Sequence, residues 1–576
     1  MKRCKLILIA FLLGLSILPV SAEIDLTVNG SVALRAKFTP EEFWQVERKL
    51  HLNSLLDFGD NIHGKIGIKG LGSGDNWLPI YSEVGTYDVT VDRVTVYTKA
   101  PLYPGCNNVL YTVGDIEINY SDYALRVDDS LWYNGQMVNP HKRGAALFGF
   151  NLPLQRIGVL ENLNAVLDLG IFWDTGNSRR YHSELWDDLN SGVNLKNNGK
   201  VYAARLNLGK EQNNLLLTSV NFVGNVDKLI SDSESDRYKM EEQTVVLEQK
   251  KQADNFSLQS VWGLNRRQYN YLVSFNNGAG TIIDSLPKAI SSEGRLSLVE
   301  FGYKFGPLTT KVGYQYIDPN FDPEYRDRRP RYDKYGKLLS WNPIDSLTTL
   351  PGVIYGTYEQ MYDPQGSYRI GKQGTFVAID AKIAELEATC SFNQFKVLGT
   401  NLANNNFDLW DGRIKVPFGK NTFRALFEQI SQQNVRTADQ RSNKYTTRFL
   451  KGEVERPLVE REYALSLVGS YEYEDLFNTS QYRTTSNIFL AYEIQEGKFV
   501  GLGAKIGLAY RNNYALTGKD HTLYKRASLA WRIPSGLSIL ANWTTPNSED
   551  NGLYDRYGKE YIGEDNLLEL SVGFEF

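Results

Sequence analysis

The strongest constraint on the fold is an apolar–polar alternation with a period of two. The segment 498–511 reads KFVGLGAKIGLAYR, in which every second residue from Val500 is apolar and the residues between are mostly glycine and cations. Successive side chains of a β-strand point to opposite faces of a sheet, so this segment predicts a strand with one apolar face. The same pattern recurs at 163–173, 299–305 and 463–474. The chain is therefore expected to be all-β.

A soluble sandwich also alternates, so two further features decide the class of sheet. Aromatic residues lie at the ends of the expected strands, and short connections alternate with long ones, as in transmembrane barrels. Strands cross hydrocarbon only when the sheet closes, because unpaired backbone amides are costly there. We expect a large antiparallel up-and-down barrel. At ~10 residues per crossing it has about 24 strands, within a range of roughly 18 to 26.

The first residues read as an export signal. Residues 1–22 (MKRCKLILIAFLLGLSILPVSA) combine Lys2, Arg3 and Lys5 with an apolar run that ends at Pro19 and small residues before Ala22. This is the pattern of a secretory signal peptide. The expected organisation is a signal peptide at 1–22 and a barrel over 23–576. Strands that start near Ile24 would leave no room for an amino-terminal plug.

The last residues, 568–576 (LELSVGFEF), alternate and end on Phe576. They resemble the closing strand of bacterial outer-membrane β-barrels, which carries the signal read by the barrel-assembly machinery. The resemblance implies location in the cell outer membrane, with outer-membrane lipid and that machinery as partners.

Charge and motifs exclude other classes. Lys and Arg number 63 against 67 Asp and Glu, so the field that a nucleic-acid binder needs is missing. The sequence contains no GxSxG, HExxH or paired CxxC, and its five histidines are scattered. We expect no enzyme activity, cofactor or metal. A barrel hydrolase with His521 beside Asp520, or His141 near Asp128, is kept as a minor alternative.

The residues opposite the apolar face are expected to line the lumen. Both signs are represented among them, so no ion preference follows. The candidates are Lys65, Lys69, Asp168, Arg205, Glu300, Lys304, Lys311, Asp380, Lys382, Arg424, Glu428, Lys505, Arg511, Arg526 and Arg532.

One connection, 318–370, is far longer than the others and rich in tyrosine, arginine and acids. By position and length it resembles the inward-folded loop that narrows general porins. An extracellular cap and a disordered segment are the alternatives. The candidate constriction residues are Tyr325, Arg326, Arg328, Arg329, Arg331, Tyr332 and Tyr335.

The stretch 111–152 (YTVGDIEINYSDYALRVDDSLWYNG…RGAALFGFNL) resembles a block of the alginate-export porins. In that family a strand with a Gly-Arg-Gln pattern leads through a Trp-containing loop to a second strand. Here Gly114-Asp115 stands where Gly-Arg would be, and Trp132 keeps the aromatic. The resemblance implies the class, a porin-like outer-membrane channel, and not the solute.

A wide barrel without a plug encloses water. The sequence therefore predicts passive passage of small hydrophilic solutes. The alternative is a barrel whose loops serve as an adhesin or assembly anchor.

Overall fold

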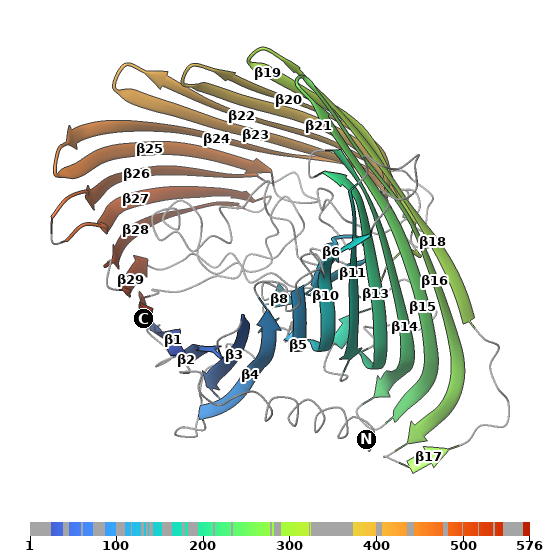
Figure 1. The fold of residues 1–576 in the computed structure, drawn as a ribbon. Helices are drawn as coiled ribbons and strands as arrows, with labels where there is room; N and C mark the ends of the chain where they lie inside the picture. Colours follow the sequence, from blue (N-terminus) through green and yellow to red (C-terminus); the bar gives the residue numbers. More distant parts are fainter. Residues whose placement is uncertain are drawn as a thin grey trace.

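The chain forms one large antiparallel β-barrel in a computed structural model. A 26-stranded sheet contains 24 strands in a closed ring, and the other two, β12 and β17, are short additions at its margin. Figure 1 shows the strands running around this ring. The structure describes residues 25–38, 45–58, 61–72, 87–98, 110–116, 118–127, 132–133, 136–137, 142–152, 164–174, 179–181, 194–210, 213–231, 234–276, 279–281, 290–318, 320, 321, 323, 372–398, 406–434, 443–475, 482–497, 499–515, 518–533, 536–544 and 568–575.

Ring strands of the first half, in order around the barrel, are β1 (Asp25–Phe38), β2 (Gln45–Asp57), β3 (Ile62–Gly72), β4 (Tyr87–Thr98), β5 (Leu110–Ile116), β10 (Lys142–Leu152), β11 (Ala165–Asp174), β13 (Asn194–Lys210), β14 (Asn213–Ser231), β15 (Glu234–Ala253), β16 (Phe256–Asn276) and β18 (Ile290–Phe305). The second half comprises β19 (Leu308–Ile317), β20 (Lys372–Ile383), β21 (Leu386–Val397), β22 (Asn406–Phe418), β23 (Asn421–Asn434), β24 (Asn443–Glu460), β25 (Tyr463–Asp475), β26 (Tyr482–Ile494), β27 (Leu502–Ala515), β28 (Gly518–Arg532), β29 (Leu537–Thr544) and β30 (Leu568–Glu575).

Six short strands stand outside the ring order. β12 (Arg179–Tyr181) pairs with β13, and β17 (Ala279–Thr281) pairs with β16. Between β5 and β10, two separate hairpins form: β6 (Ile118–Ser121) with β7 (Leu125–Val127), and β8 (Trp132–Tyr133) with β9 (Gln136–Met137).

The first and last described strands close the ring. β1 pairs with β2 on one side and with β30 on the other, where Val32 lies opposite Phe574. Both sheet edges are thereby paired, which removes the free edges that a sheet of this size would otherwise present. The predicted fold class and the predicted number of strands are confirmed.

Burial alternates along the strands as the sequence pattern predicts. On β27, Ile506 and Leu508 are exposed, whereas Lys505 and Ala509 on either side of them are buried. On β30, Leu568, Leu570 and Phe574 are exposed on one face. The outward face of the barrel is thus apolar and the inward face carries polar and charged side chains, the reverse of a water-soluble domain.

Tight two-residue turns join strands at one edge of the barrel. Five of them are Asp254–Asn255, Gly306–Pro307, Ala384–Glu385, Gly419–Lys420 and Arg461–Glu462. β1 begins and β30 ends at this same edge. The last of these turns follows directly on Glu460, where β24 ends.

In the part of the chain that the structure describes, no helix is long and apolar enough to span a membrane.

Candidate functional site on the inward face of the barrel

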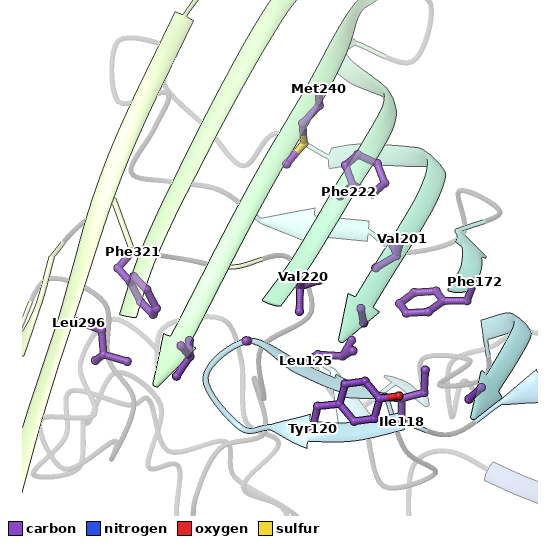
Figure 2. Close-up of a cluster of buried hydrophobic side chains, with 14 of the residues drawn as sticks. Ile118, Tyr120, Leu125, Phe172, Val201, Val220, Phe222, Met240, Leu296 and Phe321 are labelled. Carbon is purple, nitrogen blue, oxygen red and sulfur yellow. The ribbon is translucent and has the colours of Figure 1, made fainter. Parts of the chain in front are cut away.

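Inside the ring, the β6–β7 hairpin lies against the wall formed by β10 to β16. Ile118, Tyr120 and Leu125 of the hairpin are almost completely buried. They belong to one apolar cluster with inward side chains of the wall, including Phe172 and Val201 (Figure 2). We call this part of the inner surface the covered wall; its other apolar members include Val220, Phe222, Met240, Val246 and Val261. The hairpin therefore supplies the cover that lets an inner wall be apolar.

Two predicted lumen residues hold this hairpin. Asp168 on β11 and Arg205 on β13 lie opposite each other, and Arg205 Nε donates to Asp168 Oδ2 at 2.7 Å. Arg205 Nη1 reaches the backbone oxygen of Asn119 on β6 at 3.2 Å, and its guanidinium lies 5.2 Å from the ring centre of Tyr120. The other carboxylate oxygen of Asp168 accepts the backbone N–H of Gly149 at 2.8 Å. One ion pair thus connects three strands of the wall to the hairpin.

The start of the long 318–370 connection also lies on the covered wall. Asp318 N donates to Arg295 O at 2.9 Å, and the Phe321 side chain is completely buried. A Cβ built on Gly294 of β18 would lie 2.1 Å from Phe321 N, so glycine is required for this close approach. The described beginning of the connection therefore turns inward. The predicted constriction residues Tyr325 to Tyr335 lie outside the described residues.

A buried polar ladder crosses β15 and β16 on the inward face. Arg267 Nε is 2.6 Å from Glu242 Oε2, and the two side chains are 0% and 2% exposed. Next to them, Asn265 Nδ2 donates to Thr244 Oγ1 at 2.8 Å. On β15 and β16 the covered wall therefore carries a buried ion pair in addition to its apolar cluster.

On the far side of the ring, β23 to β26 carry inward ion pairs in place of an apolar cluster. Arg424 contacts both Glu453, at 2.9 Å, and Glu455, at 2.8 Å. Lys451 pairs with Glu472 at 2.9 Å, and Arg483 with Glu474 at 2.8 Å. Together with β27 and β28 we call this surface the charged wall. β26 stands twelve strands from β13 in the ring of 24, so the charged wall faces the covered wall.

The charged wall becomes cationic on β27 and β28. Lys505, Arg511 and Arg526 are 8%, 2% and 5% exposed, and all three are on the inward face. Arg526 lies opposite Gly507, which is two positions from Lys505. Lys505 Nζ is 5.3 Å from the ring centre of Phe489 on β26. Three cations of these two neighbouring strands are thus buried on the inward face.

The remaining predicted lumen residues are dispersed. Lys311 pairs with Glu300 at 3.1 Å, and Lys382 with Glu387 at 3.5 Å. Lys65 is half-buried. Lys304 and Asp380 are exposed. The side chains of Lys69, Glu428 and Arg532 are not among those that the structure describes.

The sequence-based list omitted Glu242 and Arg267. A signal was available, because the tight turn Asp254–Asn255 fixes the pairing of β15 with β16. Counting back from that turn brings Glu242 opposite Arg267, as the structure has them. The β6–β7 hairpin was also missed. Its signal is that wall strands such as β14 (NNLLLTSVNFVGNVDKLIS) carry apolar residues on both faces, which requires a cover on the inner side.

Within the described ranges, no group of three or more His, Cys, Asp or Glu side chains is placed to hold a metal ion.

These features define a large closed antiparallel barrel with an apolar exterior and a charged, partly filled interior, the architecture of outer-membrane barrels. No family model matches the chain, and no curated protein matches it either.

Solved structures with a similar outline include the following three. The siderophore receptor PirA from Pseudomonas aeruginosa is 8% identical, with a TM-score of 0.41 over 95% of this chain and 80% of the receptor. The ferric citrate transporter FecA is 10% identical, with a TM-score of 0.42 over 96% and 79% of the two chains. The P pilus usher PapC pore is 9% identical, with a TM-score of 0.39 over 96% and 99%. Similarity this low assigns neither a family nor an activity.

The resemblance to alginate-export porins has no support from these comparisons and stays a prediction. The departure from that pattern, Asp115, has a structural explanation. Asp115 Oδ2 accepts the backbone N–H of Val94 at 2.7 Å, and Thr95 Oγ1 donates to Asp115 O at 2.5 Å. An aspartate at this position therefore completes the pairing of β4 with β5.

Proposed function

We propose that this chain is an outer-membrane channel for the passive passage of small hydrophilic solutes. The barrel spans the membrane with its 24 strands, and solutes cross along the charged wall. Outer-membrane lipid surrounds the outward face, and the barrel-assembly machinery recognises the closing strand β30.

One observation supports this proposal above the others, the reversal of polarity across the wall. Leu450, Tyr471, Ile488 and Ile506 are between 45% and 64% exposed on the outward face, yet the inward neighbours Glu474 and Arg483 are buried and paired. At ~25 cal/mol per Å² of apolar surface, an outward face of this kind is costly in water and favourable in hydrocarbon. A polar inward face, in turn, suits a water-filled lumen.

The part of the charged wall formed by β23 to β26 suits small solutes of either charge. Along β23 to β26 each described cation of the inward face lies against a carboxylate, so polar solutes find donors and acceptors of both kinds. A ring of a single sign, which confers strong ion selectivity, is not formed by these strands.

Conductance across a planar bilayer tests the proposal directly. The full-length protein, refolded in detergent and added to one side, is expected to give discrete and reproducible current steps. A folded barrel that inserts without any steps would contradict the channel. That result would favour the adhesin or assembly anchor.

A further inference from the structure

We propose that the β6–β7 hairpin is the fixed constriction of the barrel and that Arg205 is the residue that positions it. The inference rests on the proposed channel function, because its conductance measurements require a barrel that conducts. It assigns the narrowing to residues 118–127, whereas the sequence assigns it to the 318–370 connection.

The hairpin lies inside the ring although the chain reaches it from two ring strands. It comes from the connection between β5 and β10, yet it pairs with neither strand and forms its own small sheet. Figure 1 shows β6 within the ring, and Figure 2 shows Ile118, Tyr120 and Leu125 beside wall residues of β11, β13 and β14. A two-stranded element lying on the inner wall necessarily reduces the space left for water.

The hairpin fits closely against the wall. A Cβ built on Gly170 of β11 would lie 2.8 Å from Ile118 Cδ1 and 3.4 Å from Tyr120 Oη. The missing side chain at Gly170 thus leaves the room in which these two hairpin residues sit. The approach is close enough that a larger residue would displace the hairpin.

The ion pair between Asp168 and Arg205 holds the hairpin in place. Asp168 is 3% exposed and fixes the guanidinium of Arg205, which in turn binds the hairpin through Asn119 O and the Tyr120 ring. Arginine suits this task because its planar fork can donate to two partners in fixed directions. Arg205 therefore affects the width of the lumen by holding the hairpin against the wall.

Consequently, solute is confined to the other side of the lumen. The hairpin covers the apolar cluster of the covered wall, and the charged wall lies half the ring away. A hydrophilic solute then meets the ion pairs of β23 to β26 and the cations of β27 and β28.

Two variants release the hairpin by independent means. Arg205→Met removes the fork, and Gly170→Val fills the space under Ile118 without changing any charge. Both are expected to raise the unitary conductance, roughly twofold, because the passage widens. Arg205→Lys keeps the charge beside Asp168 but offers a single donor group, so an intermediate conductance is expected.

Matched controls separate this effect from general damage. Arg266→Met removes an equivalent arginine on the outward face, where Arg266 pairs with Glu293 at 3.0 Å. Gly452→Val adds the same side chain at an outward strand glycine whose Cβ would meet nothing within 4 Å. Neither control is expected to change the conductance.

A chemical measurement tests the hairpin without relying on conduction. In a chain with Cys4, Cys106 and Cys390 replaced by serine, Ser121→Cys is expected to react slowly with a membrane-impermeant maleimide, since Ser121 is only 4% exposed. Adding Arg205→Met or Gly170→Val is expected to accelerate that reaction at least about tenfold, as the hairpin leaves the wall.

The outcomes are distinguishable. If the parent conducts and the variants change neither conductance nor labelling, the inference is wrong and the channel stands. Faster labelling with unchanged conductance would overturn the constriction while retaining the contact. If the parent never conducts, the channel proposal fails, and slow labelling that stays slow in both variants would also overturn the hairpin contact.

Discussion

The guanidinium of Arg267 and the carboxylate of Glu242 meet across β15 and β16 at 2.6 Å, both almost fully withdrawn from solvent. They are registered partners in the hairpin closed by Asp254–Asn255. A buried pair of this kind is strongly destabilised when one member is lost, because the other charge stays buried.

We therefore expect Glu242→Gln to lower the free energy of unfolding by about 3–5 kcal/mol. Urea titration of the refolded barrel, followed by tryptophan fluorescence, measures this change. Arg266→Met is the control, because that neighbouring arginine makes an exposed outward pair worth ~0–1 kcal/mol. Equal losses in the two variants would contradict the buried pair as a major contributor.

A turn residue offers a gain in stability. Ala384, the first residue of the β20–β21 turn, has φ 51°, a conformation that costs L-residues roughly 1 kcal/mol. Ala384→Gly is expected to raise the urea midpoint. Gly419 occupies the same place in the β22–β23 turn with φ 61°, so Gly419→Ala is expected to lower it. Shifts of the same sign in both variants would show that backbone strain is not the cause.

The cations of β27 and β28 predict a change in ion preference. Arg526→Met removes one of three clustered inward cations, which is expected to lower the anion-to-cation permeability ratio by a factor of roughly 2. Reversal potentials under a salt gradient measure the ratio. Lys525→Met, a charge change at an exposed neighbour on the other face, is the control and should leave the ratio unaltered. A ratio that stays constant in Arg526→Met would place this cluster outside the conducting path.

Much of the fold could be predicted because strands in a barrel obey local rules. The alternation in 498–511 gives both faces of β27, and tight turns such as Gly419–Lys420 mark strand ends. The inward hairpin could not be predicted in the same way. Ile118 and Tyr120 alternate like any ring strand, and only contacts with distant residues such as Arg205 place them inside.

The same limit applies to the lumen candidates. Alternation assigns Asp168 and Arg205 to the inward face, and the structure has them there. It says nothing of their further partners, which come from two other segments of the chain, β10 and β6. Periodicity thus predicts which face a side chain takes, whereas its role depends on what folds against that face.

The most direct test of which face of the barrel contacts lipid uses β21, where neighbouring side chains on the two faces are both exposed. In a chain lacking Cys4 and Cys106, a fluorophore is attached to Cys390, which is exposed on the outward face. In a second chain, which lacks Cys390 as well, it is attached to a cysteine introduced at the inward neighbour Thr389. In lipid vesicles, the label at Cys390 is expected to be quenched by nitroxide-bearing lipids, and the label at Thr389→Cys by aqueous iodide. A label at Cys390 that iodide quenches and lipid nitroxides do not would contradict a barrel with lipid outside and water within.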